Sequence, residues 1–191
     1  SEIIECVKNR DSIRKKYSID NDTICLGSVA AFITQKNHEY IIDILASMLK
    51  KKENVKLILI GTGCRKNKII DYIKKLGVED RIIMLGERQD VYNLLSAIDV
   101  IIMPSFYEGL PVSALEAQIA GCSVFITDNV DRDVCLSNKI HFKSLLDGSD
   151  SWADNIIKNK EEYKNRLPYL DNRYKIENTV VAMRDIYENG R

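Results

Sequence analysis

Residues 99–127, with the sequence DVIIMPSFYEGLPVSALEAQIAGCSVFIT, decide how the chain folds. Runs rich in apolar residues at 100–103 and 123–127 have the length of buried strands, and a helix begun by Pro111 lies between them. A strand, a helix and a second strand in this order are typical of parallel α/β sheets. We therefore expect an α/β fold with a doubly wound, Rossmann-like parallel sheet.

Strands and helices alternate along the rest of the chain at the same rhythm. Gly77 stands in the position that a helix C-terminus favours. Further strands are expected at 23–31, 55–60 and 81–85, helices at 40–49, 69–76 and 91–97, and a short helix followed by a strand within 134–142.

The two ends of the chain carry weaker patterns. A short helix is expected within residues 5–17, capped at Asp11-Ser12, and an amphipathic helix at 152–163. Pro168 breaks the pattern before a last helix at 176–187. We therefore divide the chain into a lead-in segment (1–17), a Rossmann-like nucleotide-sugar-binding domain (18–167) and a C-terminal helix (168–191).

Composition bears on partners and location. The 191 residues suffice for one domain with a hydrophobic core, and 28 Lys and Arg balance 28 Asp and Glu, which gives no basis for a nucleic-acid partner. No membrane span or signal peptide is evident, so we expect a cytoplasmic protein. The five scattered cysteines indicate neither a disulfide framework nor a zinc site. Basic clusters such as 50–52 fit solvated helix ends, and peripheral contact with the inner face of a membrane stays open.

The turn before Pro111 is expected to expose Ser105, Tyr107 and Glu108, while Glu116 lies about a turn and a half into the helix. In open α/β sheets, ligands bind outside the carboxyl ends of the strands, where helix N-termini attract anions. We expect the two carboxylates to hold different parts of one extended anionic ligand. The alternative is that Glu108 only caps the helix and that Glu116 is solvated.

Lys36 lies in the loop after the first strand. In a doubly wound sheet this loop opens onto the same edge as the turn at Glu108, so the Lys36 ammonium is in position to meet a phosphate there. An ordinary exposed lysine is the equally weighted alternative.

Three other patterns suggest chemistry but have simpler interpretations. The Gly61-Thr62-Gly63 turn follows a strand, yet Lys66 stands where a dinucleotide-binding motif needs its third glycine, which favours a tight turn. Glu108 and Glu116 would serve as a glycosidase pair only if they flanked one bond in a closed cleft, which their spacing does not establish. The acidic loop at 128–131 is a candidate cation site, although such loops are usually solvated.

The corner formed by residues 104–121 (PSFYEGLPVSALEAQIAG) resembles the signature of the retaining glycosyltransferases of family 4, in which two glutamates are separated by seven residues. The resemblance extends through FITQKNHEYII, VKLILIGTG, RIIMLGERQDVYNLLSAIDVIIMPS and GCSVFITDNV, in the order of the family. It implies a GT-B enzyme in which two Rossmann-like domains face a cleft. This chain would be the C-terminal domain, which binds the nucleotide sugar.

The resemblance also implies roles for residues of the corner. Glu108 matches the first glutamate, a catalytic residue that contacts the donor sugar near the reacting centre. Glu116 matches the second, which holds the ribose hydroxyls of the nucleotide. Backbone N–H groups of Gly109 and Leu110, next to Pro111 at the helix start, would meet the diphosphate or the donor sugar.

Two further matches complete the implied donor site. Lys36 matches the lysine that neutralises the leaving diphosphate, and the segment Arg88-Gln89-Asp90 matches the one beside the base. Such enzymes need no bound metal or other cofactor, because cationic side chains and helix dipoles stabilise the departing nucleoside diphosphate. The implied substrates are a nucleoside-diphosphate sugar and a glycan or lipid-linked acceptor, in surface polysaccharide synthesis.

Two departures from the family pattern bear on activity. Ala31 stands where the family usually carries an arginine that partners the lysine on the diphosphate, and the loss of one such contact costs about 1.5–3 kcal/mol. The N-terminal acceptor-binding domain is missing, so the chain alone is expected to bind a donor weakly and to turn nothing over. The alternative, which Ala31 favours, is a non-catalytic Rossmann-like module that acts as a partner or regulatory domain.

Overall fold

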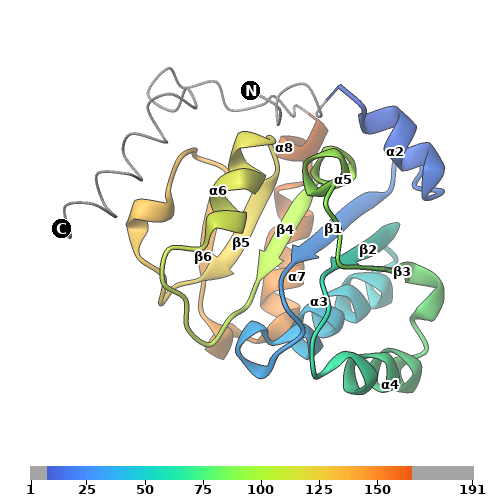
Figure 1. Cartoon of the computed structure of the whole chain (residues 1–191), viewed down its shortest axis with the longest axis horizontal. Coiled ribbons are helices and arrows are strands. Elements are labelled where there is room, and N and C mark those ends of the chain that lie inside the picture. Colours follow the sequence, from blue (N-terminus) through green and yellow to red (C-terminus); the bar gives the residue numbers. More distant parts are fainter. Residues whose placement is uncertain (1–7, 165–191) are drawn as a thin grey trace.

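The computed structural model describes residues 8–164 of the chain (Figure 1). The strands are β1 (Ile24–Val29), β2 (Val55–Ile60), β3 (Ile82–Gly86), β4 (Val100–Met103), β5 (Ser123–Thr127) and β6 (Ile140–Lys143). The α-helices are α2 (Arg10–Lys16), α3 (His38–Lys50), α4 (Lys66–Leu76), α5 (Val91–Ala97), α6 (Val112–Ile119), α7 (Gly148–Lys158) and α8 (Lys160–Lys164). Short 3-10 helices are η1 (Thr34–Lys36), η2 (Glu79–Arg81), η3 (Arg132–Val134) and η4 (Leu145–Asp147).

The strands form one six-stranded sheet in the order β3-β2-β1-β4-β5-β6, and every neighbouring pair is parallel. The expected doubly wound parallel sheet is therefore confirmed. The chain runs from β1 outward to β3, then returns to place β4 on the other side of β1, so the strand order reverses between β1 and β4. Open α/β sheets bind their ligands at the carboxyl side of such a reversal.

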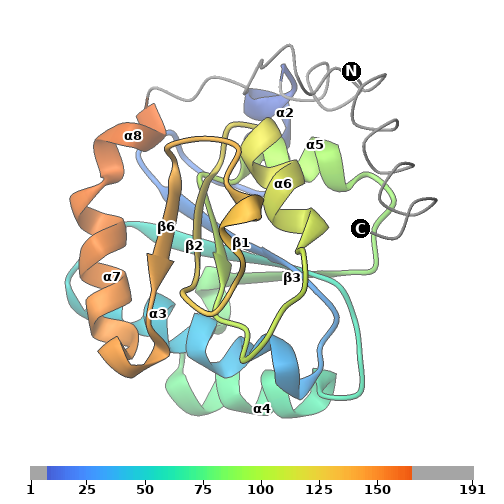
Figure 2. The ribbon, with the colours of Figure 1, turned by 90° about the vertical axis from the view of Figure 1, so that its left-hand side faces the viewer.

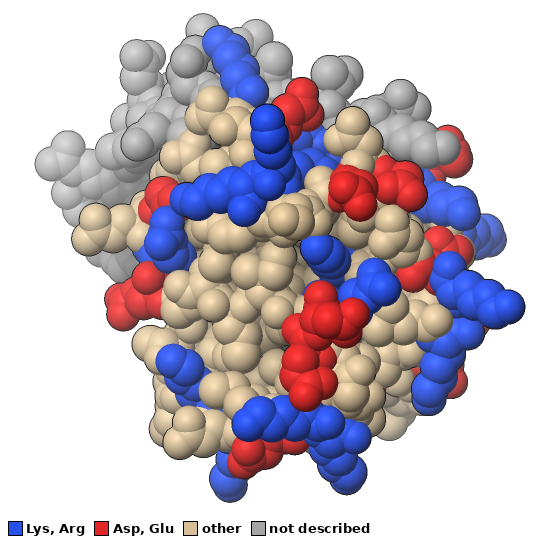
Figure 3. Space-filling model, turned by 90° about the vertical axis from the view of Figure 1, so that its right-hand side faces the viewer, with Lys and Arg blue, Asp and Glu red and all other residues tan. Residues whose placement is uncertain are grey.

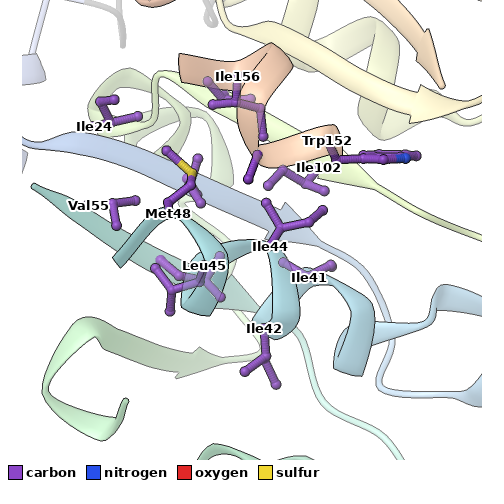
Figure 4. Close-up of a cluster of buried hydrophobic side chains, with 14 of the residues drawn as sticks. Ile24, Ile41, Ile42, Ile44, Leu45, Met48, Val55, Ile102, Trp152 and Ile156 are labelled. Atoms are coloured by element: carbon purple, nitrogen blue, oxygen red, sulfur yellow. The ribbon is translucent and has the colours of Figure 1, made fainter. Parts of the chain in front are cut away.

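Helices cover both faces of the sheet, with α3, α4 and α7 on one face and α2, α5 and α6 on the other (Figure 2). Each face has its own hydrophobic cluster, because a parallel sheet buries both of its faces. Figure 4 shows part of the cluster beneath α3 and α7, in which Trp152 and Ile156 of α7 lie near Ile44 and Met48 of α3.

Helix α2 is held to the sheet by a buried ion pair. The predicted cap at Asp11-Ser12 is wrong, because Asn9 precedes the helix and its side chain makes no capping hydrogen bond. Arg14 is 2% exposed, and its guanidinium lies 3.2 Å from Oδ2 of Asp99. Arg10 reaches Oδ1 of the same carboxylate at 2.5 Å. Arg14 also donates to three main-chain carbonyls, those of Ala97, Asp20 and Thr23.

The helix predicted at 152–163 is in fact two helices. Helix α7 ends at Lys158, and the backbone N–H of its C-cap, Asn159, bonds back to the carbonyls of Asn155 and Ile157; α8 begins at Lys160. Trp152 and Ile156 point inward as expected, and Ile157 packs against the same cluster. The predicted helix at 176–187 lies outside the described residues, and the domain boundaries at 17 and 168 stay predictions.

Within residues 8–164, none of the helices combines the length and the apolar character that crossing a membrane requires.

Candidate functional site

The loops after β1 and β4 are joined at the carboxyl edge of the sheet, at the strand reversal. The backbone N–H of Phe106 donates to the carbonyl of Gln35 at 2.9 Å, and the Gln35 side chain donates to the carbonyl of Tyr107 at 2.8 Å. Asn37 donates from its side chain to the carbonyl of Pro104 at 3.2 Å. These bonds make the two loops one connected unit.

Lys36 and Glu108 form an ion pair within this unit. Nζ of Lys36 lies 2.6 Å from Oε1 of Glu108, and the Ser105 hydroxyl donates to the same oxygen at 2.6 Å. The Glu108 side chain is 7% exposed and the Lys36 side chain 21%. The structure thus brings the predicted cation and the first glutamate together, with the ammonium still partly accessible.

The turn between β4 and α6 differs from the prediction at two residues, Ser105 and Glu108. The Glu108 side chain is only 7% exposed. Tyr107 is 65% exposed as expected, but Ser105 is only 1% exposed. Its carbonyl accepts a hydrogen bond from the Thr127 hydroxyl at 3.1 Å, which draws the turn against the end of β5. Ser105 stands three positions before Glu108, a spacing that usually signals a helix cap, so the role of Ser105 in holding the Glu108 carboxylate was missed.

Glu116 lies half-buried on α6, away from the Lys36 contact. The Tyr92 hydroxyl, from α5, donates to Oε1 of Glu116 at 2.9 Å. Tyr92 was also missed, because its partner is 24 positions away and only the packing of α5 beside α6 brings the two together. The second glutamate is therefore oriented by a neighbouring helix and is not simply solvated.

Arg88 and Asp90 lie after β3 and bind each other. Nε and Nη2 of Arg88 each donate to a different oxygen of Asp90 at 2.8 Å. This hydrogen bonding raises the pKa of Arg88 and lowers the pKa of Asp90. Gln89 between them is exposed. The structure places this segment at the same edge of the sheet as Lys36, but no direct contact joins them.

A hollow of about 340 Å³ separates Arg88 from the loop after β1. Gly61 needs to be glycine there, because its φ is +136° and a Cβ would lie 2.1 Å from the carbonyl oxygen of Ala30. A Cβ on Gly63 would likewise meet Phe32 at 2.6 Å. These glycines therefore allow close backbone packing, as the tight-turn interpretation predicts. The hollow is lined by Val29, Ala30, Ala31, Ile60, Gly61, Thr62, Glu87, Arg88 and Val91.

A second hollow, of about 620 Å³, opens beside the start of α6. Glu108, Gly109 and Leu110 form one wall, and the loop at 128–133 forms the other. Pro111, which was predicted to begin the helix, is its N-cap, and the first helical residue is Val112. Asp131 accepts a hydrogen bond from the backbone N–H of Asp133, which caps η3. Across residues 8–164 no three His, Cys, Asp or Glu side chains gather closely enough to hold a metal ion.

His38 opens α3 and is buried, with its ring edge-on to Phe32 at a centroid distance of 4.6 Å. Among the described residues neither ring nitrogen has a hydrogen-bond partner. Burial lowers the pKa of His38 to about 4; Glu39 opposes this shift, and Lys36 and Arg65 add to it. The neutral imidazole is therefore the form that fits the fold.

We expect acid to destabilise the chain through His38. The unfolded chain takes up this proton near pH 6.5 and the folded chain only near pH 4, so stability is full above pH 6.5 and falls between these values. The expected loss of unfolding free energy from pH 7 to pH 5 is about 2 kcal/mol. Urea unfolding at both pH values measures it. His38→Leu should show less of this loss, and an equal loss in the variant would contradict the assignment.

Comparison with known proteins identifies the family. The family described as "Glycosyl transferases group 1" matches residues 9–175. The chain belongs to this family. One relative is the putative glycosyltransferase EpsF of Bacillus subtilis, which is 28% identical over 188 residues. The alignment covers 93% of this chain and 48% of EpsF. The O-antigen biosynthesis glycosyltransferase WclY of Escherichia coli is 29% identical over 127 residues, covering 66% of this chain and 35% of WclY. The chain thus spans half or less of the length of these relatives.

Solved structures of glycosyltransferases share the fold. Anabaena HepE in complex with UDP and glucose has a TM-score of 0.77 at 20% identity and covers 95% of this chain and 51% of HepE. The C-terminal domain of the group 1 protein LpcC from Francisella tularensis has a TM-score of 0.66 at 20% identity and covers 82% of this chain and 86% of that domain. The expected Rossmann-like fold of GT-B glycosyltransferases is therefore confirmed.

Proposed function

We propose that this chain is the C-terminal, donor-binding domain of a retaining glycosyltransferase of family 4. The whole enzyme would transfer a sugar from a nucleoside-diphosphate sugar to a glycan or lipid-linked acceptor. The observation that supports this most directly is the Lys36–Glu108 ion pair, which lies at the strand reversal and beside the start of α6. A cation, a carboxylate and a helix N-terminus at one corner suit the phosphates and sugar of such a donor.

Charge develops on the diphosphate when the bond to the sugar breaks, and this corner has groups to receive it. In the proposal the Lys36 ammonium turns from Glu108 to the phosphate oxygens, while the N–H groups of Gly109 and Leu110 donate to the diphosphate or the sugar. Because a side-chain cation and a helix N-terminus carry this charge, we propose transfer without a bound metal or other cofactor.

The two glutamates have separate tasks in this proposal. Glu108 keeps the hydrogen bond from Ser105 when Lys36 moves, so its carboxylate stays directed at the donor sugar next to the reacting bond. Glu116 is held through one oxygen by Tyr92, which leaves the other oxygen to accept from the ribose hydroxyls. Neither carboxylate has to leave its observed position.

The segment after β3 is proposed to lie beside the base. Asp90 holds Arg88 through Nε and Nη2, which keeps the guanidinium at the hollow beside Gly61 with Nη1 left to donate. Gln89 is exposed next to it and offers an amide with both donor and acceptor groups.

Coverage supports the assignment to one domain of a longer protein. This chain matches 51% of HepE but 86% of the separate C-terminal domain of LpcC. We propose that an N-terminal domain supplies the acceptor site, so that this chain alone binds donor and turns nothing over. The name of WclY supports a role in surface polysaccharide synthesis. We place the whole protein in the cytoplasm, and contact with the inner face of the membrane stays an open alternative.

A titration with nucleotides tests the proposal. UDP, GDP, ADP and their glucose conjugates are added to the ¹⁵N-labelled chain, and amide chemical shifts are followed. We expect at least one nucleotide to shift resonances at Lys36 and at residues 108–116. If none of them perturbs these residues, the chain is not a donor-binding domain.

The second candidate is a non-catalytic module with a degenerate site. Ala31 favours it, because this uncharged residue stands where the resemblance to family 4 implies an arginine that partners Lys36 on the diphosphate. Ala31→Arg separates the two functions. A working donor site should bind the nucleotide more tightly once the second cation is present, whereas a degenerate one should not respond.

A further inference from the structure

The hollow of about 340 Å³ at the carboxyl ends of β1, β2 and β3 lies between two parts of the proposed donor site. Val29 lines this hollow and also the small cavity next to Lys36, where the diphosphate is proposed to bind. Val91 lines it too, and the following residue of α5, Tyr92, holds Glu116, which is proposed to bind the ribose. A nucleotide that reaches both Lys36 and Glu116 therefore has its base within reach of this hollow.

The lining of this hollow suits a flat ring with a polar edge. Most of it is aliphatic, and among the described residues only Glu87 and Arg88 bring charge to it. Ligand sites are mainly apolar, use a few placed polar groups to fix orientation, and have volumes from about 300 to about 1,000 Å³. At about 340 Å³ this hollow is near the lower end of that range, so it suits one part of a nucleotide, namely its base.

The Arg88 guanidinium is a fixed hydrogen-bond donor at the rim of this hollow. Nε and Nη2 each donate to Asp90 at 2.8 Å, and within residues 8–164 no acceptor pairs with Nη1. A guanidinium carries N–H donors and no acceptor, so Nη1 pairs only with an acceptor on the base. Glu87 is exposed and is able to turn away from a base, whereas Asp90 keeps Arg88 in place.

Nucleotide bases differ in the exocyclic group that they present to such a donor. Uracil, guanine and hypoxanthine carry a carbonyl oxygen where cytosine and adenine carry an amino group. The oxygen accepts a charge-assisted hydrogen bond from the guanidinium, whereas the amino group places a donor against a donor. Figure 3 looks onto the side of the molecule on which β3 lies, and shows basic and acidic side chains mixed over largely uncharged surface. A single fixed group is therefore better suited to discriminate between bases than the net charge of this face.

We infer that Arg88 selects a donor nucleotide whose base carries this carbonyl oxygen, as in uridine and guanosine diphosphates, over one whose base carries the amino group. This selection rests on the proposed function, because it needs a nucleotide at this edge of the sheet. It adds the class of base, which the ion pair between Lys36 and Glu108 does not determine.

Matched pairs of nucleotides test this selection on the ¹⁵N-labelled 191-residue chain. Uridine and cytidine diphosphates differ at the position that carries the oxygen or the amino group, as do inosine and adenosine diphosphates. Titrations followed by amide chemical shifts give the four dissociation constants. In the pair that binds more tightly, we expect the nucleotide with the oxygen to bind at least about tenfold better than its partner, because the partner lacks a hydrogen bond to a charged group.

Arg88→Gln tests the role of the guanidinium, because an amide both donates and accepts and so pairs with either exocyclic group. The ratio of the two dissociation constants should then fall to within about threefold. Arg81→Gln is the matched control. It makes the same change just before β3, where Arg81 pairs with Asp80, and should leave the ratio unchanged. Thermal unfolding of both variants checks that the fold is retained.

Failure of base selection and failure of the proposed function are distinguishable. If none of the four nucleotides shifts a resonance, the chain has no donor site, and both proposals are wrong. If nucleotides bind without the expected preference, or the one with the amino group binds more tightly, base selection is wrong while the proposed function stands. A preference for the oxygen that Arg88→Gln leaves unchanged overturns the role of Arg88.

Discussion

With UDP as the probe nucleotide of the proposed donor site, Lys36→Ala is expected to weaken binding by about 10- to 150-fold, which corresponds to about 1.5–3 kcal/mol for a hydrogen bond to a charged group. Lys36 is the cation that contacts Glu108, and Glu108 has a side chain that is 7% exposed. Without the ammonium, the diphosphate loses an attraction and also meets an uncompensated carboxylate. Calorimetric titration at one fixed ionic strength measures the change, because salt screens such contacts.

Lys51→Ala is the matched control for this prediction. Lys51 pairs with Asp154, whose side chain is 63% exposed, at the far end of α3. Its loss should leave UDP affinity unchanged. Lys36→Met keeps most of the aliphatic stem and should weaken binding as Lys36→Ala does. A folded Lys36 variant that binds UDP as tightly as the original chain would show that this residue does not hold the diphosphate.

Asp99→Ala is expected to lower the free energy of unfolding by about 3–5 kcal/mol, because it leaves the buried guanidinium of Arg14 without its anion. Arg14 is 2% exposed and Asp99 4%. The substitution also removes the acceptor of the Cys25 backbone N–H, which bonds to Oδ2 of Asp99 at 2.8 Å. Chemical unfolding followed by the fluorescence of the single tryptophan, Trp152, measures the loss, because that indole is fully buried in the folded chain.

Asp154→Ala provides the comparison. It also removes a carboxylate from an ion pair, but an exposed one, so its cost should stay below about 1 kcal/mol. Removing both buried charges with Arg14→Met/Asp99→Leu should cost less than Asp99→Ala alone, because no buried charge is then left unpaired. Equal losses for Asp99→Ala and Asp154→Ala would show that the Arg14–Asp99 pair does not hold α2 to the sheet.

The central elements of the fold could be predicted from local sequence. The bounds predicted for β2, β4, β5 and α5 agree with the structure. Each of these strands is a short run of mainly apolar residues that a parallel sheet buries on both faces, so burial and local pattern point to the same element. Gly77 ends α4 with φ 66°, a conformation that glycine adopts without strain.

The ends of elements were less predictable where long-range contacts decide them. The break between α7 and α8 at Asn159 has no proline or glycine to announce it. The cap expected at Asp11-Ser12 is absent because α2 begins before it, at Arg10, so both residues lie within the helix. The helix is fixed through the Arg14–Asp99 ion pair. Arg14 and Asp99 are 85 positions apart, so no local pattern links them.

For the candidate site, the sequence determined which residues gather at the carboxyl edge. Strand order and the loops after β1 and β4 are properties of a doubly wound sheet, so the proximity of Lys36 and Glu108 follows from their positions in the alternation of strands and helices. Only the tertiary structure decided how each carboxylate is held. Ser105 bonds to Glu108 and Tyr92 to Glu116 because of the way the β4–α6 turn packs on β5 and α5 packs beside α6. Hydrogen bonds require matching of atoms within a few tenths of an ångström, and that precision arises from packing between distant segments, which the local pattern of a sequence does not encode.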